Sequence, residues 1–121
     1  MIEHLIDGER VGSRDTFQTL NPATSEVIDE VASGGETEVA AAVAAAKRAF
    51  PGWAATPAAQ RARLMRRLGD LIAQNVAELS TLETQDTGQV IAQTKKALVP
   101  RAADNFYFFS EVCTRMDGEC Y

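Results

Sequence analysis

The sequence predicts an α+β fold in which short antiparallel strands come first and helices follow. Alternating apolar and polar residues, broken by turn signals, fill the first third of the chain up to Gly34-Gly35. From Glu36 onward the apolar residues recur at intervals typical of one helix face. The chain has 121 residues, which is enough for one modest hydrophobic core.

The strands are expected within residues 4–33. Asp7-Gly8 stands between two short apolar segments and is a signal for a hairpin turn. Asn21-Pro22 ends another alternating segment, and the turn that it opens leads to the next one. We therefore expect short antiparallel strands arranged as β-hairpins.

The remaining chain is expected to form four to five helices. Their approximate ranges are 36–50, 57–73, 76–87, 90–97 and 99–116. Pro51-Gly52 is expected to end the first helix, because proline removes a helical hydrogen bond and glycine favours turns. Thr56 is the expected N-cap of the second helix, with Pro57 in its first turn.

Capping residues also divide the later helices. Asn75 and Glu78 form an approximate capping box for the third helix, and Gly88 suits a left-handed cap at its end. Pro100 lies where a last helix begins, and proline is favoured in a first helical turn. We therefore expect Pro100 to start that helix, which is expected to reach about Met116.

Composition excludes several classes of protein. The 12 basic and 17 acidic residues give a net charge of −5, whereas domains that neutralise phosphates are usually basic. No apolar run is long enough to span a membrane, and the acidic N-terminus does not resemble a signal peptide. We therefore expect no nucleic-acid partner, no membrane partner and a cytoplasmic location.

No catalytic constellation is evident in the residues. Cys113 and Cys120 lack the paired spacing of a zinc site. The only histidine, His4, stands at the other end of the sequence, so neither thiol has an adjacent base in the sequence. A glycine-rich nucleotide motif is also missing. The residues alone predict a globular α+β module without a catalytic or cofactor-binding residue.

Five blocks occur in the order found in one enzyme family. They are TLNPATSEVI (19–28), AF-x2-W (49–53), RARLMRRLGDLI (61–72), ELSTLETQDTG (78–88) and NFYFF (105–109). Together they make the chain resemble the N-terminal portion of the NAD-dependent aldehyde dehydrogenase superfamily. The segments VASGGETEV and VPRAADNFYFFSEVC resemble the branch that oxidises 5-carboxymethyl-2-hydroxymuconate semialdehyde in breakdown of the aromatic compound homoprotocatechuate.

This resemblance implies that residues 1–121 are an α+β fragment, the start of an NAD-binding domain without its dinucleotide-binding sheet or the catalytic domain. The family's catalytic cysteine and glutamate lie in later segments, so the chain alone is expected to be inactive. The parent is expected to be a homo-oligomer that uses NAD. Two alternatives stay open, namely a free-standing helical interaction module and a pseudoenzyme derived from an aldehyde dehydrogenase.

The resemblance also implies a substrate-binding residue. The position that matches Arg101 faces the substrate entrance in the superfamily, and the branch that acts on carboxylated semialdehydes is similar to this chain in having arginine after proline. A guanidinium group matches a carboxylate with two parallel hydrogen bonds. Asn105, one turn later, is expected to support Arg101. The alternative is a surface arginine paired with an acid such as Asp104.

A monovalent cation site is implied in the same way. Its ligands would be backbone carbonyls around Thr19 and Leu20, with the carboxylate of Asp86. Hard oxygen ligands suit such an ion. The alternative is that Asp86 only helps to end its helix.

Overall fold

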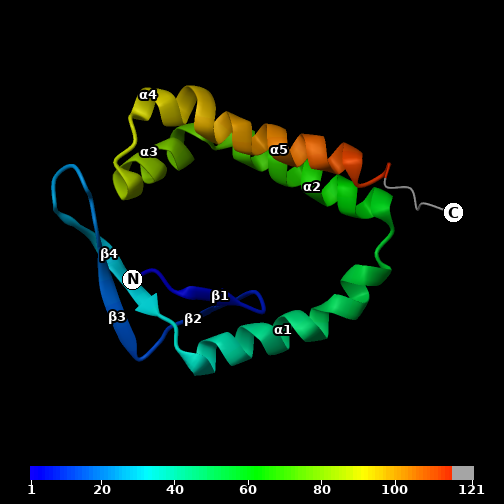
Figure 1. Cartoon of the computed structure of the whole chain (residues 1–121), viewed down its shortest axis with the longest axis horizontal. Coiled ribbons are helices and arrows are strands. Elements are labelled where there is room, and N and C mark those ends of the chain that lie inside the picture. Colours follow the sequence, from blue (N-terminus) through cyan, green and yellow to red (C-terminus); the bar gives the residue numbers. More distant parts are fainter. Residues whose placement is uncertain (116–121) are drawn as a thin grey trace, which may run out of the picture. The chain divides into compact units, whose positions relative to one another are not determined.

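The computed structural model describes residues 1–115 and confirms the α+β fold (Figure 1). The chain divides into two compact units, Met1–Ala55 and Thr56–Tyr121. All strands of the described chain belong to the first unit, together with one helix, and the second unit is helical. No helix within residues 1–115 is long and apolar enough to cross a membrane.

The first unit contains two antiparallel hairpins. Their strands are β1 (His4–Ile6), β2 (Glu9–Val11), β3 (Asp15–Leu20) and β4 (Val27–Ser33). The predicted turn between β1 and β2 is confirmed, because Asp7 and Gly8 both have positive φ, at 56° and 82°. Two such residues in sequence form the turn whose twist matches a two-residue hairpin. In the second turn, the Asn21 side-chain oxygen accepts a hydrogen bond of 2.9 Å from the Ala23 N–H.

Helix α1 (Glu36–Ala55) completes the first unit and is longer than predicted. The Glu38 carboxylate accepts a hydrogen bond of 2.7 Å from the Gly35 N–H and so caps the start of the helix. The expected end at residue 50 is wrong, since the helix passes through Pro51. A proline removes one helical hydrogen bond and bends a helix, but the alanine-rich sequence on both sides has a high helix propensity.

The second unit begins with two helices, α2 (Ala58–Gln74) and α3 (Val76–Thr87), close to their predicted bounds. The capping predictions were less accurate. The N-cap of α2 is Pro57, whose carbonyl accepts from the N–H of Gln60 and Arg61, so the prediction of Thr56 as N-cap is wrong. Gly88 has φ of 74° and caps the end of α3 as expected.

The predicted capping box at the start of α3 is also wrong. Asn75 makes no side-chain hydrogen bond to the first turn of α3. Its amide nitrogen instead donates to the Leu71 carbonyl of α2 at 2.8 Å. The Asn75 backbone N–H also donates to this carbonyl at 3.1 Å, so Asn75 caps the end of α2 rather than the start of α3.

The last two predicted helices form one continuous helical segment. It consists of α4 (Ile91–Gln93), the π-helix η1 (Thr94–Leu98) and α5 (Val99–Val112), as Figure 1 shows. Pro100 lies in the first turn of α5, as predicted, but α5 is not separate from the preceding turn, because Leu98 and Val99 already have helical backbone angles. The helix ends at Val112, short of the predicted end, and Met116 lies outside the described residues.

Few large apolar side chains are buried in the described part of the chain. Its buried hydrophobic residues are Ala32, Ala45, Val99 and Ala103. The apolar helix face predicted for α1 is exposed instead, with Phe50 66% exposed and Val39 61% exposed. The stripe of α2 is similar, since Leu64 is 56% exposed. These faces contribute little burial free energy to offset the loss of chain entropy.

We therefore expect the isolated 121-residue chain to be marginally stable. Heating it should give a broad, gradual loss of helical circular dichroism, and the exposed stripes should bind a hydrophobic dye before heating. Calorimetry of the same sample provides the check. A sharp transition of a monomer, with equal calorimetric and van't Hoff enthalpies, would contradict this expectation.

Candidate functional site

Arg101 lies on α5, and the position of this helix is fixed by a close contact with α2. Gly69 of α2 is buried against the ring of Tyr107 on α5. A Cβ atom added at Gly69 would lie only 2.6 Å from Cε1 of that ring. Only glycine lets the two helix backbones approach this closely without displacing the ring.

Polar groups join the same two helices on either side of this contact. The Tyr107 hydroxyl donates a hydrogen bond of 3.0 Å to Oδ1 of Asp70. Desolvation, followed by this bond to the Asp70 carboxylate, raises the pKa of Tyr107 above its usual value. Arg66 forms a looser ion pair with Glu111, with 3.8 Å between Nη2 and Oε1.

A second anchor holds the start of the continuous helix against α3. Thr94 is fully buried. Its hydroxyl lies 3.1 Å from that of Thr84 and also donates to the Ile91 carbonyl at 3.0 Å, with the Ser80 carbonyl 3.4 Å away. A buried hydroxyl with several hydrogen-bond partners resists displacement. Moving it would leave buried polar groups without a hydrogen bond, which costs free energy.

The π turn of η1 changes the angle around the helix between two buried residues, Thr94 and Val99. Thr94 and Val99 are both buried although they stand five positions apart. Five residues of an α-helix turn about 500°, which would place the two side chains about 140° apart. In η1 the Val99 N–H donates to the Thr94 carbonyl, so the wider turn takes up the extra residue. Pro100 has no N–H and cannot extend this pattern, so α-helical bonding resumes after it.

The resulting register turns Arg101 outward. Val99, Ala103 and Ser110 are the buried residues of α5. Arg101 follows Val99 by two positions, about 200° around the helix, and its side chain is exposed. Asn105 is exposed on the same face. Within residues 1–115 no ion pair joins Arg101 to Asp104, so the alternative of a surface pair finds no support there.

The predicted cation ligands belong to different units of the chain. Thr19 and Leu20 end β3, where the register with β4 shifts between these two residues. Asp86 lies in the last turn of α3. No group of three or more histidine, cysteine, aspartate or glutamate side chains gathers within residues 1–115. The site of Thr19, Leu20 and Asp86 stays a prediction.

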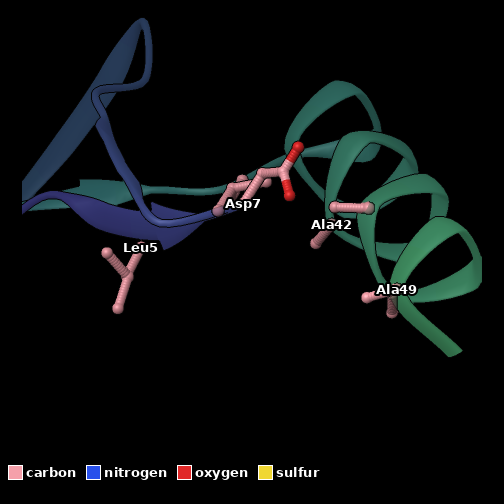
Figure 2. Close-up of a pocket in the computed structure, with 7 residues that line it drawn as sticks. Leu5, Asp7, Ala42 and Ala49 are labelled. Carbon is pink, nitrogen blue, oxygen red and sulfur yellow. The ribbon is translucent and has the colours of Figure 1, made fainter. Parts of the chain in front are cut away.

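A pocket of about 280 Å³ lies in the first unit, between the β1–β2 turn and α1. Figure 2 shows the Asp7 carboxylate reaching toward this helix, where Ala42 and Ala49 line the pocket. Asp7 forms an ion pair of 2.8 Å with Arg48. Apart from the Asp7 carboxylate, which is paired with Arg48, the pocket is lined by alanine, leucine and isoleucine.

The cysteine in the described region has a structural contact. Cys113 Sγ lies 3.7 Å from the Ala58 carbonyl, which links the end of α5 to the start of α2. A backbone carbonyl is too weak a base to remove the thiol proton, so this contact does not generate a thiolate. The absence of a catalytic cysteine in this chain stays a prediction, and Cys120 lies outside the described residues.

Comparison with known proteins identifies the class of protein to which this chain belongs. The sequence profile of the aldehyde dehydrogenase family matches residues 10–121. The chain belongs to the aldehyde dehydrogenase family.

Individual relatives show which branch of the family this chain resembles. The chain is 58% identical to 5-carboxymethyl-2-hydroxymuconate semialdehyde dehydrogenase of Escherichia coli over 99% of its own length and 26% of that protein. It is 35% identical to 2-aminomuconic semialdehyde dehydrogenase of Bos taurus, again over 99% of this chain and 25% of the relative. The expected resemblance to the muconate semialdehyde branch is confirmed. The chain spans about a quarter of the length of these relatives.

The fold is also that of a solved family member. The structure of an aldehyde dehydrogenase from Bacillus cereus in complex with NAD⁺ is 34% identical and has a TM-score of 0.93. The match covers 98% of this chain and 25% of that one. The relatives are enzymes, and the helix that carries Arg101 is thus part of an enzyme fold.

We expect Gly69→Ala to loosen the α2–α5 pair. The added methyl group would overlap the Tyr107 ring, and overpacking of this kind costs about 1–3 kcal/mol. Amide hydrogen exchange in α2 and α5 of the 121-residue chain should become faster. Gly52→Ala is the matched control, because a Cβ there meets nothing within 4 Å and alanine is the better helix former. Equal exchange in wild type and Gly69→Ala would contradict the packing argument.

Proposed function

We propose that this chain is the N-terminal part of a cytoplasmic NAD-dependent dehydrogenase that oxidises a carboxylated semialdehyde to the acid. The single observation that carries the proposal is Arg101, an exposed guanidinium without an ion-pair partner in the described residues. It stands on a helix anchored to both α2 and α3. Such a group binds a carboxylate through two parallel hydrogen bonds.

The names of the relatives support the class of substrate. Both muconate semialdehyde dehydrogenases act on molecules that carry a carboxylate in addition to the reacting aldehyde. The candidates are 5-carboxymethyl-2-hydroxymuconate semialdehyde and its close relatives, as in the breakdown of homoprotocatechuate. Binding of the remote carboxylate by Arg101 would hold the substrate in one orientation at the reacting centre.

The chemical step belongs to segments outside residues 1–121. No residue of this chain is predicted to be the nucleophilic cysteine of the family or the glutamate that activates water. NAD bound to the whole enzyme would supply the hydride acceptor, and the solved relative with NAD⁺ supports this choice of cofactor. The chain alone is therefore expected to be inactive, and the whole enzyme a homo-oligomer. Dehydrogenase activity of the isolated chain would contradict this expectation. It would also argue against the two alternatives, an interaction module and a pseudoenzyme, because neither is catalytic.

A monovalent cation is a second part of the proposal. The register shift between Thr19 and Leu20 alters the regular hydrogen bonding of the β3–β4 ladder at the residues whose carbonyls are implied as ligands. The Asp86 carboxylate would supply the negative charge. A ligand from a later segment would complete the site.

We expect Arg101→Ala to lower kcat/KM selectively for a carboxylated semialdehyde. A suitable background is a chimera in which residues 1–121 replace the matching segment of the E. coli relative. Loss of a charge-assisted pair is worth roughly 1.5–3 kcal/mol, or about 10- to 150-fold in kcat/KM. Steady-state kinetics on a carboxylated semialdehyde and on a neutral aldehyde provide the measurement.

Two controls sharpen this test. Arg101→Lys keeps the charge but loses the planar fork, so its loss should be intermediate. Lys95→Ala removes an exposed cation from η1 and should leave the ratio of the two kcat/KM values unchanged. Equal losses on both aldehydes after Arg101→Ala, or no loss on either, would refute the proposed role.

We expect Asp86→Asn in the same chimera to weaken stabilisation by potassium or sodium. The substitution keeps the size of the side chain and removes the charge that would attract the ion. Thermal denaturation across a series of potassium chloride concentrations, with choline chloride as the control salt, measures the effect. An unchanged response to the two salts would remove the cation from the proposal and leave Asp86 as a residue that helps to end α3.

A further inference from the structure

The outer face of α5 contains an aromatic residue in register with Arg101. Arg101, Asn105 and Phe108 stand at positions i, i+4 and i+7, and all three are exposed. Residues seven apart in an α-helix lie within about 20° of each other and about 10 Å apart along the axis. Helical side chains also lean toward the N-terminus, so Phe108 leans toward Arg101.

The Phe108 ring is exposed but does not move freely. It is 61% exposed, the most of the aromatic residues of α5. The neighbouring Phe109 contacts it edge to face, with ring centroids 5.2 Å apart and an angle of 82° between the planes. Such pairs are favourable, so the contact restricts the orientation of the Phe108 ring.

The face therefore combines a cation, an amide and an oriented ring in one line. The guanidinium requires an anion, and the ring favours a flat partner that offers a π-surface. A conjugated semialdehyde with a carboxylate at its far end has both properties, because alternating double bonds keep its chain planar. A saturated semialdehyde of the same length offers the carboxylate but no flat surface.

We propose that Phe108 is a second specificity-determining residue, whose ring stacks on the planar conjugated body of the substrate while Arg101 binds its carboxylate. This inference rests on the proposed function and adds the requirement for conjugation. The Asn105 amide lies between the two residues along the helix. It is placed to hydrogen-bond a polar substituent of the same planar chain.

The test compares three substrates in the chimera that carries residues 1–121. They are a conjugated carboxylated semialdehyde of the muconate type, a saturated carboxylated semialdehyde of similar length, and a neutral saturated aldehyde. Phe108→Leu keeps apolar volume and removes the flat ring. It should lower kcat/KM about three- to ten-fold for the conjugated substrate and leave the ratio of the other two unchanged. Phe108→Tyr retains the ring and should restore the conjugated preference.

Phe50→Leu is the matched control, because it makes the same change at an exposed ring on another helix, α1. It should alter the three kcat/KM values by similar factors. Equal losses for the conjugated and the saturated carboxylated substrates after Phe108→Leu would overturn the inference and place the ring against protein. So would the absence of any loss.

The outcomes separate the two proposals. Arg101→Ala tests the carboxylate and should affect both carboxylated substrates, whereas Phe108→Leu should affect only the conjugated one. Arg101→Ala could lower kcat/KM for both carboxylated substrates while Phe108→Leu does not distinguish the conjugated from the saturated one. This result would retain the proposed function and overturn the present inference. The reverse pattern would support stacking by Phe108 and remove the carboxylate-binding role of Arg101.

Discussion

The close approach of α2 and α5 at Gly69 is the constraint on which the second unit depends. A residue with a side chain at this position would displace Tyr107, and with it the hydroxyl that bonds to Asp70. The contact therefore fixes both the distance between the helices and their rotation. Because Val99 and Ala103 are buried in the resulting register, the opposite face of α5 is turned outward. The direction of Arg101 thus follows from the packing of residues on the buried face of the helix.

The hydroxyl of Thr94 imposes a second condition on the same helix. One uniform α-helix would place the buried residues Thr94 and Val99 about 140° apart, because five residues do not complete a whole number of turns. The π turn resolves the conflict at the cost of less favourable hydrogen bonding, which is a common feature of segments near functional sites. Pro100 ends the π pattern by its missing N–H, so the proline sets the point from which α-helical spacing leads to Arg101.

Much of the fold was predictable because local signals and tertiary structure agree. The Asp7-Gly8 turn and the cap at Gly88 depend on backbone angles that these residues favour by themselves. The continuation of α1 through Pro51 and the fusion of the last helices were not predictable in this way. Proline has two opposite readings in a sequence, as a helix start and as an interruption, and packing decides between them. The spacing of buried residues that reveals the π turn is visible only once burial is known.

The candidate site was predictable only in part, for a related reason. Arg101 was conspicuous because a charged residue interrupts an apolar helix, and the family resemblance gave it a role. Phe108 carried no such signal, since an aromatic residue in an apolar helix is most simply a core residue. Its register with Arg101 distinguishes it from Phe109, which is also exposed. Recognition groups on an anchored helix can orient a substrate whose chemistry occurs elsewhere, and binding energy from a remote carboxylate then contributes to the rate at the aldehyde. Under the proposed function, that division would explain how a segment without a nucleophile determines which aldehyde is oxidised.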